Sequence, residues 1–349
     1  MRPSDSHCSR TANVGRASRL PCERVSASRA TRFFLLAVIG TCSCDAGVFS
    51  EDFSLSPTSR GWRTFGDGSL FSWNSANQVL EVTWDSSRMN SYFFRPLGTI
   101  LGKSDNFAFQ FDLRLQSIQA GPNPAKPSTF EIAAGLFRLE SATNPAFNRG
   151  TGRDSPNLVE WDYFPAADII EATVSPVIVS SNSQFIPGFS YPLEMPVNDL
   201  FRIALAYTAS NQTLVTTMTR NGAAFGPIQN VRLPASFTDF RVDAFSISSY
   251  NDAGDEAGSI LARGVIDNVV VTTPAPPLES LALRIGNGVA RVQFAGRTNW
   301  SYTLQRSVDL TSFVSVQTVN GPATTNVVLE DVFTTAAINR FYRVRADRP

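Results

Sequence analysis

Beyond residue 46 this 349-residue chain contains neither cysteine nor histidine. The cysteines (Cys8, Cys22, Cys42 and Cys44) and the single histidine, His7, all lie before that point. A chain cleaved near residue 46 would therefore have no disulfide, no Cys or His ligand for structural zinc, and no histidine for a Ser-His-Asp or Cys-His triad. Its stability would have to come from a large apolar core, which a chain of this length can build.

Long apolar runs are also scarce. The clearest, Phe33–Gly40, follows Arg32 and is well short of the roughly 20 residues that a membrane-spanning helix needs. Small residues and Cys44-Asp-Ala46 come next, a pattern typical of a signal peptide. We therefore expect residues 1–46 to be a signal peptide with an over-long basic leader, and the protein to be secreted, periplasmic or at the cell surface, with no membrane span. Lipid attachment at Cys44 is a less favoured alternative, because Thr41 is a poor residue three positions before that cysteine.

The chain also has no net excess of either charge, since 30 basic residues balance 30 acidic ones. Seven arginines and only three acidic residues lie in the first 46 positions, so the rest of the chain is slightly acidic with scattered arginines. A nucleic-acid partner calls for a clustered basic face. We therefore expect no nucleic-acid binding.

What the chain does contain, from Val48 onward, is a series of short alternating runs between Gly, Asn, Asp, Ser and Pro clusters, with almost no helical periodicity. In Phe107–Leu115 the odd positions are all Phe or Leu, and the even positions from Gln110 onward are polar. Thr129–Leu139 is apolar on both faces, which predicts a central strand. Further strands are predicted at Gln78–Trp84, Ser91–Arg95, Val174–Ser180, Phe201–Tyr207, Thr213–Arg220, Asp239–Ser248 and Gly264–Thr272.

These runs predict an all-β antiparallel sandwich over residues 47–273. The proline-rich stretch around Thr273–Pro277 predicts an extended linker at 274–279. Shorter alternating runs predict a second, small β domain at 280–349. Among Trp62, Trp73 and Trp84, at least two are expected in the core.

The most informative stretch is Asn157–Pro165. As a strand it would place one set of side chains on one face and a second set on the other: Glu160, Asp162 and Phe164 against Val159, Trp161 and Tyr163. Two neighbouring carboxylates on a sheet face repel each other, so their presence indicates a compensating cation, sugar, arginine or catalytic task. Arg149 and Arg153, in the loop just before, are candidate partners, and with Glu160 and Asp162 they form the predicted ligand-binding set.

With this acidic strand, the number of strands and the closing Gly264–Val271, residues 48–273 resemble the concanavalin A-like lectin/glucanase superfamily. The resemblance implies a jelly roll of two large antiparallel sheets, the concave one bearing a ligand cleft. The C-terminal domain, with Tyr302–Leu310 and Asn339–Val344, resembles a small β-module of secreted bacterial proteins for which we expect no catalytic role.

The superfamily has two relevant branches, and the resemblance to each implies a different role for the acidic strand. In laminarinase-like glycosidases the motif is E-x-D-x-E or E-x-D-x-x-E; Glu160 and Asp162 match its first two positions, but Phe164 or Pro165 stands where the proton donor should be. In legume lectins the motif is V-E-x-D-x-[YF]-P, which residues 159–165 fit. Ala166 replaces the calcium-binding Asn, and no histidine follows. This branch implies a possible lone Ca²⁺ held by Asp162, the Phe164 carbonyl, and Asp168 or Glu171.

Three functions follow as hypotheses. The leading one is a secreted, non-catalytic protein that binds a polysaccharide or cell-surface glycan through this strand. The second is a glycoside hydrolase with Glu160 and Asp162 in the catalytic set, which requires a further carboxyl nearby. The third is a structural or adhesive sandwich with no small ligand. For Glu160 and Asp162 themselves, the alternative to a functional role is that both are hydrogen-bonded or paired with arginine on a solvated sheet face. The acidic loop Asn251–Glu256 is expected to be a solvated turn rather than a calcium loop.

Overall fold

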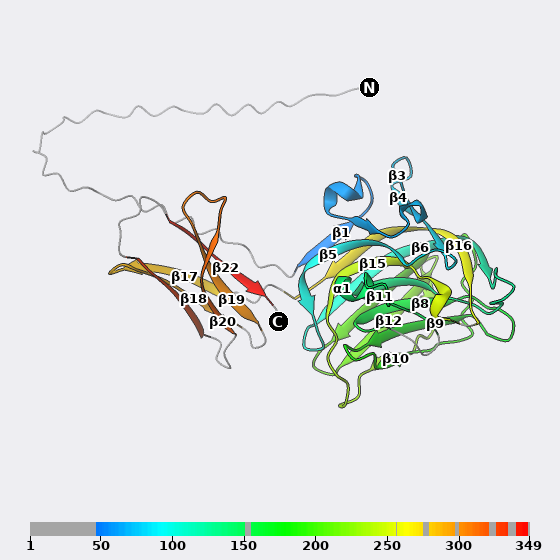
Figure 1. Cartoon of the computed structure of the whole chain (residues 1–349). Coiled ribbons are helices and arrows are strands. Elements are labelled where there is room, and N and C mark those ends of the chain that lie inside the picture. Colours follow the sequence, from blue (N-terminus) through cyan, green and yellow to red (C-terminus); the bar gives the residue numbers. More distant parts are fainter. Residues whose placement is uncertain are drawn as a thin grey trace, which may run out of the picture. The chain divides into compact units, whose positions relative to one another are not determined.

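The computed structural model describes residues 47–150, 155–255, 257–274, 279–296, 300–320, 326–333 and 340–347. Strands make up most of the regular structure, and the strands of each sheet pair in antiparallel fashion (Figure 1). The predicted all-β class is confirmed. Within these ranges no helix has the length and apolar character needed to cross a membrane.

The first large sheet has nine strands in the order β13-β12-β11-β6-β16-β4-β3, with β1 added beside β16 and β14 beside β12. Their bounds are β1 Val48–Glu51, β3 Phe71–Asn74, β4 Val79–Asp85, β6 Phe107–Ala120, β11 Phe201–Thr208, β12 Thr213–Arg220, β13 Ala223–Phe225, β14 Val231–Arg232 and β16 Ile260–Thr272. The alternation predicted for Phe107–Leu115 is confirmed, because its Phe and Leu side chains are all buried.

The second large sheet has seven strands in the order β10-β9-β8-β7-β15-β5-β2. Their bounds are β2 Arg63–Phe65, β5 Ser91–Leu101, β7 Ile132–Phe137, β8 Leu158–Phe164, β9 Thr173–Val179, β10 Phe185–Pro187 and β15 Val242–Ser249. Strand β7 lies between β8 and β15 and is buried along its whole length, so the central strand predicted from its sequence is confirmed, although it is shorter than expected.

Aromatic side chains from the two sheets meet in one apolar core. Phe109 of β6 contacts Phe245 of β15, and Phe111 of β6 contacts Trp161 of β8, with ring centroids 5.6 and 5.7 Å apart. Trp62 and Trp84 are buried, as predicted for at least two of the early tryptophans. Residues 47–274 thus form a jelly-roll β-sandwich, in which each strand of the second sheet has one face toward this core and one face away from it.

Helical elements are short and connect strands. They are α1 Leu139–Ala142 and the 3-10 turns η1 Pro57–Arg60, η2 Gly68–Leu70 and η3 Asp252–Gly254. Helix α1 begins a segment that returns over the outer face of the second sheet and ends at Arg149, which contacts side chains of β8.

Residues 279–347 contain two three-stranded sheets, ordered β17-β18-β21 and β20-β19-β22. Their strands are β17 Glu279–Gly286, β18 Val289–Ala295, β19 Ser301–Ser307, β20 Val314–Asn320, β21 Asn326–Val332 and β22 Phe341–Asp347. A separate small core joins the sheets, where Phe294 of β18 packs edge-on against Tyr302 of β19.

Gly135, in the middle of β7, lies opposite Glu160 of β8. A Cβ at this position would be 2.4 Å from the carbonyl oxygen of Val159 and 2.6 Å from the Cα of Glu160, too close for any side chain. Glycine is therefore what allows β7 and β8 to approach each other here.

We expect Gly135→Ala to lower the free energy of unfolding by about 1–3 kcal/mol, because the backbone of β8 must move. Gly68→Ala is the control, since a Cβ there would meet only Thr64, at 3.6 Å, and should change stability by less than about 0.5 kcal/mol. Urea unfolding of both variants measures this, and equal losses would contradict it.

The hydroxyl of Tyr163, on the core side of β8, accepts a hydrogen bond from the backbone N–H of Met195 at 3.1 Å. Burial raises the pKa of Tyr163 to about 12. An unfolded tyrosine has a pKa of about 10, so between pH 10 and 12 the unfolded chain has lost a proton that the folded chain keeps. The contribution of Tyr163 to stability is therefore complete below pH 10 and is lost as the pH rises toward 12.

Tyr163→Phe should make the fall of unfolding free energy above pH 10 shallower by up to about 1.4 kcal/mol per pH unit. The variant should also be less stable by about 1–3 kcal/mol at neutral pH, because the Met195 N–H loses its acceptor. Urea unfolding at pH 7, 10 and 11 tests both effects. An unchanged slope in the variant would show that the prediction is wrong.

Candidate functional site

Strand β8 is central to the site and pairs with β7 on one side and β9 on the other. Asp162 lies opposite Ala133 and Ser175, and Glu160 lies opposite Gly135 and Val177. The predicted division of faces is confirmed: the ring of Trp161 is fully buried in the core, against Phe111, while Glu160 and Asp162 lie on the outer face.

The outer face of β8 is nevertheless not solvated, which corrects the sequence-based expectation. Glu160 and Asp162 are 0% and 2% exposed. Residues 139–150, which we call the covering segment, are held over the sheet by hydrogen bonds from the Tyr92 hydroxyl to the Ala142 carbonyl and from the Asn90 amide to the Phe147 carbonyl. This segment keeps water from two carboxylates that would otherwise face solvent.

Arg149, at the end of the covering segment, provides the charge that the carboxylates face. Its Nε is 3.0 Å from Oε1 of Glu131, and its Nη2 is 3.3 Å from Oε2 of Glu160 and 2.9 Å from Oδ2 of Asp162. All four side chains are buried. Arg149 therefore joins the covering segment to β8 and to the residue that precedes β7.

Tyr250, just after β15, completes this cluster. Its hydroxyl donates a 2.5 Å hydrogen bond to Oε1 of Glu160, and the Arg149 guanidinium lies 5.3 Å from the centre of its ring. Burial raises the pKa of Tyr250 well above its usual value, and the negative charge of Glu160 raises it further. The phenol therefore stays protonated and serves as a donor. We call Glu131, Arg149, Glu160, Asp162 and Tyr250 the Arg149 cluster.

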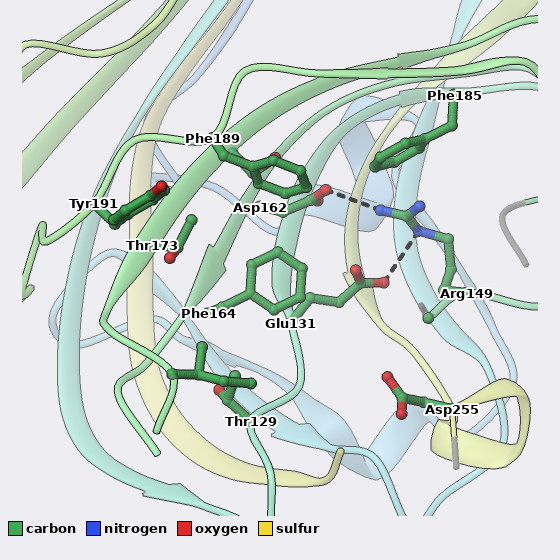
Figure 2. A pocket seen from close by; sticks show the side chains of 13 residues that line it. Thr129, Glu131, Arg149, Asp162, Phe164, Thr173, Phe185, Phe189, Tyr191 and Asp255 are labelled. Carbon is green, nitrogen blue, oxygen red and sulfur yellow. Dashed lines mark hydrogen bonds and ion pairs between the residues drawn. The ribbon is translucent and has the colours of Figure 1, made fainter. Parts of the chain in front are cut away.

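A pocket of about 450 Å³ opens beside the Arg149 cluster (Figure 2). Aromatic rings, small hydroxyl side chains and charged groups line it together: Phe164, Phe185, Phe189, Tyr191, Ile170, Thr129, Thr173, Ser175, Gly150, Glu131, Arg149, Asp162 and Asp255. Glu131, Arg149 and Asp162 thus belong both to the buried cluster and to the pocket wall. Glu160 does not line the pocket; its carboxylate contacts Tyr250 and Arg149 instead.

The aromatic side of the pocket is the most accessible. Phe189 is 46% exposed and Tyr191 is 64% exposed, and both follow the edge strand β10. The close-up view shows Tyr191, Thr173 and Phe189 on one side and Arg149 and Asp255 on the other, with the ring of Phe185 near the Arg149 guanidinium. The pocket therefore combines exposed aromatic rings with charged side chains that are themselves buried.

Asp255 comes from the acidic loop after β15. Its Oδ1 accepts hydrogen bonds from the backbone N–H groups of Ala257 and Gly258, at 2.7 and 2.9 Å. Asp252, in the same loop, is ion-paired with Lys126 at 2.9 Å. Both aspartates are buried, so the solvated turn expected here is wrong for these two residues.

The calcium ligands inferred from the resemblance differ in their surroundings. Asp168 and Glu171 are exposed, beside the bridge that pairs Ala167 with Ile170. Asp162 faces Arg149 instead, and Phe164 contributes its side chain to the pocket. Over the residues that the structure describes, no group of three or more Asp, Glu, His or Cys side chains could hold a metal ion. Arg153, the remaining predicted ligand-binding residue, lies outside the described residues.

Sequence reasoning missed Glu131, Tyr250 and the aromatic wall. Glu131 had a signal, a lone carboxylate between Phe130 and Ile132 in an otherwise apolar run. The segment Phe185–Tyr191 also had one, since three aromatic residues recur within a Pro- and Gly-containing loop. Tyr250 had none, because nothing local distinguishes it from a core tyrosine.

No protein-family model matches this chain, and no curated protein matches its sequence. Among solved structures the chain is similar to peanut lectin, at 15% identity over 66% of this chain and 100% of the lectin, with a TM-score of 0.43. It is similar to lectin II from Ulex europaeus, at 14% identity over 65% of this chain and 98% of that one, with a TM-score of 0.43. An alginate lyase is similar at 11% identity over 65% of this chain and 97% of that one, with a TM-score of 0.38.

We expect Arg149→Met to lower the free energy of unfolding by about 3–5 kcal/mol, because it takes a cation away from three buried carboxylates. Arg138→Met is the matched control. Arg138 pairs with the exposed Glu140 at 3.1 Å and lies 4.0 Å from the partly exposed Asp243, and loss of such solvent-accessible pairs costs about 1 kcal/mol or less. Urea unfolding of both variants is the measurement, and similar losses in the two would refute a structural role for the cluster.

Proposed function

We propose that residues 47–274 bind a carbohydrate, without catalysis, in the pocket beside the Arg149 cluster. The observation that carries the proposal is the combination of accessible aromatic rings with a polar floor. Phe189 and Tyr191 offer ring faces on which the apolar face of a sugar ring can stack. Thr173, Ser175 and Asp162 line the same pocket and can exchange hydrogen bonds with sugar hydroxyls.

The pocket also suits a small ligand in size. Its volume of about 450 Å³ lies within the range of known ligand sites, and most of the wall residues sit on paired strands or on segments hydrogen-bonded to them. A purely structural or adhesive sandwich would be expected to have an apolar, shallow face. Four charged side chains in a concave wall favour recognition of a polar ligand instead.

The position of Glu160 supports binding rather than hydrolysis. In the resemblance to glycosidases Glu160 would be the nucleophile, which must reach the scissile bond. Here its carboxylate is fully buried, hydrogen-bonded by Tyr250 and ion-paired with Arg149, and it does not line the pocket. A ligand in the pocket would not contact it.

A glycosidase remains the second candidate for one reason. Glu131 and Asp162 both line the pocket, and glycoside hydrolysis uses two carboxyl groups. Hydrolysis of a glycan that binds the protein, lost in both Glu131→Gln and Asp162→Asn, would favour this candidate. An intact glycan recovered after long incubation would remove it.

The proposal includes an extracellular location, so that the ligand is a polysaccharide or cell-surface glycan. It rests on the leader, which lies outside the described residues. N-terminal sequencing of the protein recovered from the producing cells would test it, with a mature terminus near residue 47 as the expected result.

We expect the full chain to bind at least one ligand on a broad glycan array. Tyr191→Ala and Phe189→Ala should each weaken that binding by about tenfold, because each removes a ring from the open wall of the pocket. Leu55→Ala is the control, since Leu55 is 59% exposed but does not line the pocket. Absence of binding to every glycan, or equal affinity in all three variants, would overturn the proposal.

A further inference from the structure

The side chains that line the pocket differ in exposure according to their polarity. Apart from the tyrosine, each charged or hydroxyl-bearing one is at most 9% exposed: Thr129, Glu131, Arg149, Asp162, Thr173, Ser175 and Asp255. The exposed fractions of the apolar and aromatic ones, Ile170, Phe185, Phe189 and Tyr191, lie between 37% and 64%. The surface that a ligand meets first on entering the pocket is therefore largely apolar.

The charged lining side chains already have partners within the protein. Arg149 is ion-paired with Glu131 and Asp162, at 3.0 and 2.9 Å. The carboxylate of Asp255 accepts the two backbone hydrogen bonds of its own loop. These four side chains are therefore committed to the fold as well as to the pocket.

Ser175 is different. It lies on β9, opposite Asp162, is 1% exposed and lines the pocket. The hydroxyl of Thr173, two positions before it, donates to the Glu171 carbonyl at 2.8 Å, whereas the Ser175 hydroxyl has no hydrogen-bond partner among the residues that the structure describes. A hydroxyl this deeply buried is normally hydrogen-bonded. Its place in the pocket wall therefore indicates a partner that enters through the pocket.

The apolar side chains of the pocket exceed what a sugar ring needs. The apolar face of one sugar ring stacks on one aromatic ring, but Phe185, Phe189 and Tyr191 provide three, and the ring centroids of Phe185 and Phe189 are 6.4 Å apart. Ile170 adds an aliphatic side chain, which offers no ring for stacking but packs well against an alkyl chain. The surplus favours a ligand with an apolar group beside its sugar.

An acyl group attached to a sugar matches both features. Its carbonyl oxygen can accept a hydrogen bond from Ser175, and its alkyl chain can pack against Ile170 and the aromatic rings. We infer, on the basis of the proposed function, that the pocket binds a glycan carrying a short acyl chain, longer than acetyl, in ester or amide linkage. The Ser175 hydroxyl donates to the acyl carbonyl, and the sugar ring stacks on Tyr191, the most exposed of the rings. Acetyl is too short, because its single methyl group reaches only part of the apolar surface.

The test uses the full chain and one saccharide with different substituents. A glycan array that includes plain and acylated glycans first identifies the saccharide and the acylated position that bind best. Five forms of that saccharide are then titrated by calorimetry at pH 6: unmodified, acetyl ester, butanoyl ester, butanoyl amide and butyl ether. We expect the butanoyl ester, the butanoyl amide or both to bind at least about tenfold more tightly than the unmodified form. The gain over the acetyl ester should be about fourfold or more, since a fully buried methylene contributes about fourfold.

The butyl ether has the same chain without the carbonyl, so it should bind about three- to tenfold more weakly than the better butanoyl form. Ser175→Ala should abolish this difference, because the carbonyl loses its donor. Ile170→Ala should reduce the gain from acetyl to butanoyl by about twofold. Val215→Ala is the control and should leave both ratios unchanged, since Val215 is 39% exposed, lies on β12 of the other large sheet and does not line the pocket.

The outcomes separate the two proposals. If no glycan binds, plain or acylated, the proposed function fails and the acyl site with it. If cyclohexyl butanoate, an ester without a sugar, binds as tightly as the acylated saccharide, the acyl site stands and carbohydrate recognition is wrong. If the saccharide binds but acylation leaves its affinity unchanged or weaker, carbohydrate binding stands and the acyl site is wrong. If Ser175→Ala folds normally and keeps the preference for the butanoyl form over the ether, Ser175 does not bind the carbonyl.

Discussion

The contact on which the site depends is the one between a single guanidinium and three buried carboxylates. Glu160 and Asp162 lie on a strand whose outer face is closed off from water, an arrangement that would be strongly unfavourable without a cation. Arg149 provides that cation from a segment outside the sheet. The ion pairs thus stabilise the carboxylates and fix the covering segment at the same time, and the position of that segment determines where the pocket opens.

The two faces of β8 have different roles. Trp161 and Tyr163 pack into the core between the sheets, whereas Glu160 and Asp162 face Arg149 on the outer side, where Asp162 also lines the pocket. The close approach of β7 at Gly135 makes room for this pairing. The same strand therefore carries side chains of the core and of the site, although their chemistry is opposite.

The strands and the division of their faces could be predicted from the sequence. The composition of the buried cluster could not, for physical reasons. Alternation of side chains is a local property, so the faces of Phe107–Leu115 and of β8 followed from it directly. Burial of Glu160 and Asp162 did not, because it depends on a segment that folds back from outside the sheet. Glu131 and Tyr250 join the cluster from positions roughly 30 and 90 residues away from Glu160 along the chain, and a single sequence does not reveal such proximity.

The exposed aromatic side chains follow β10, the last strand at one edge of the seven-stranded sheet, whereas the carboxylates are attached to interior strands and a covered loop. An edge segment can change its side chains at little cost to the fold, while interior ionic groups cannot. Related chains could therefore diversify the ring-bearing wall freely and still keep the ionic one. In evolutionary terms, the outline of the pocket could drift while the ionic network beneath it stayed the same.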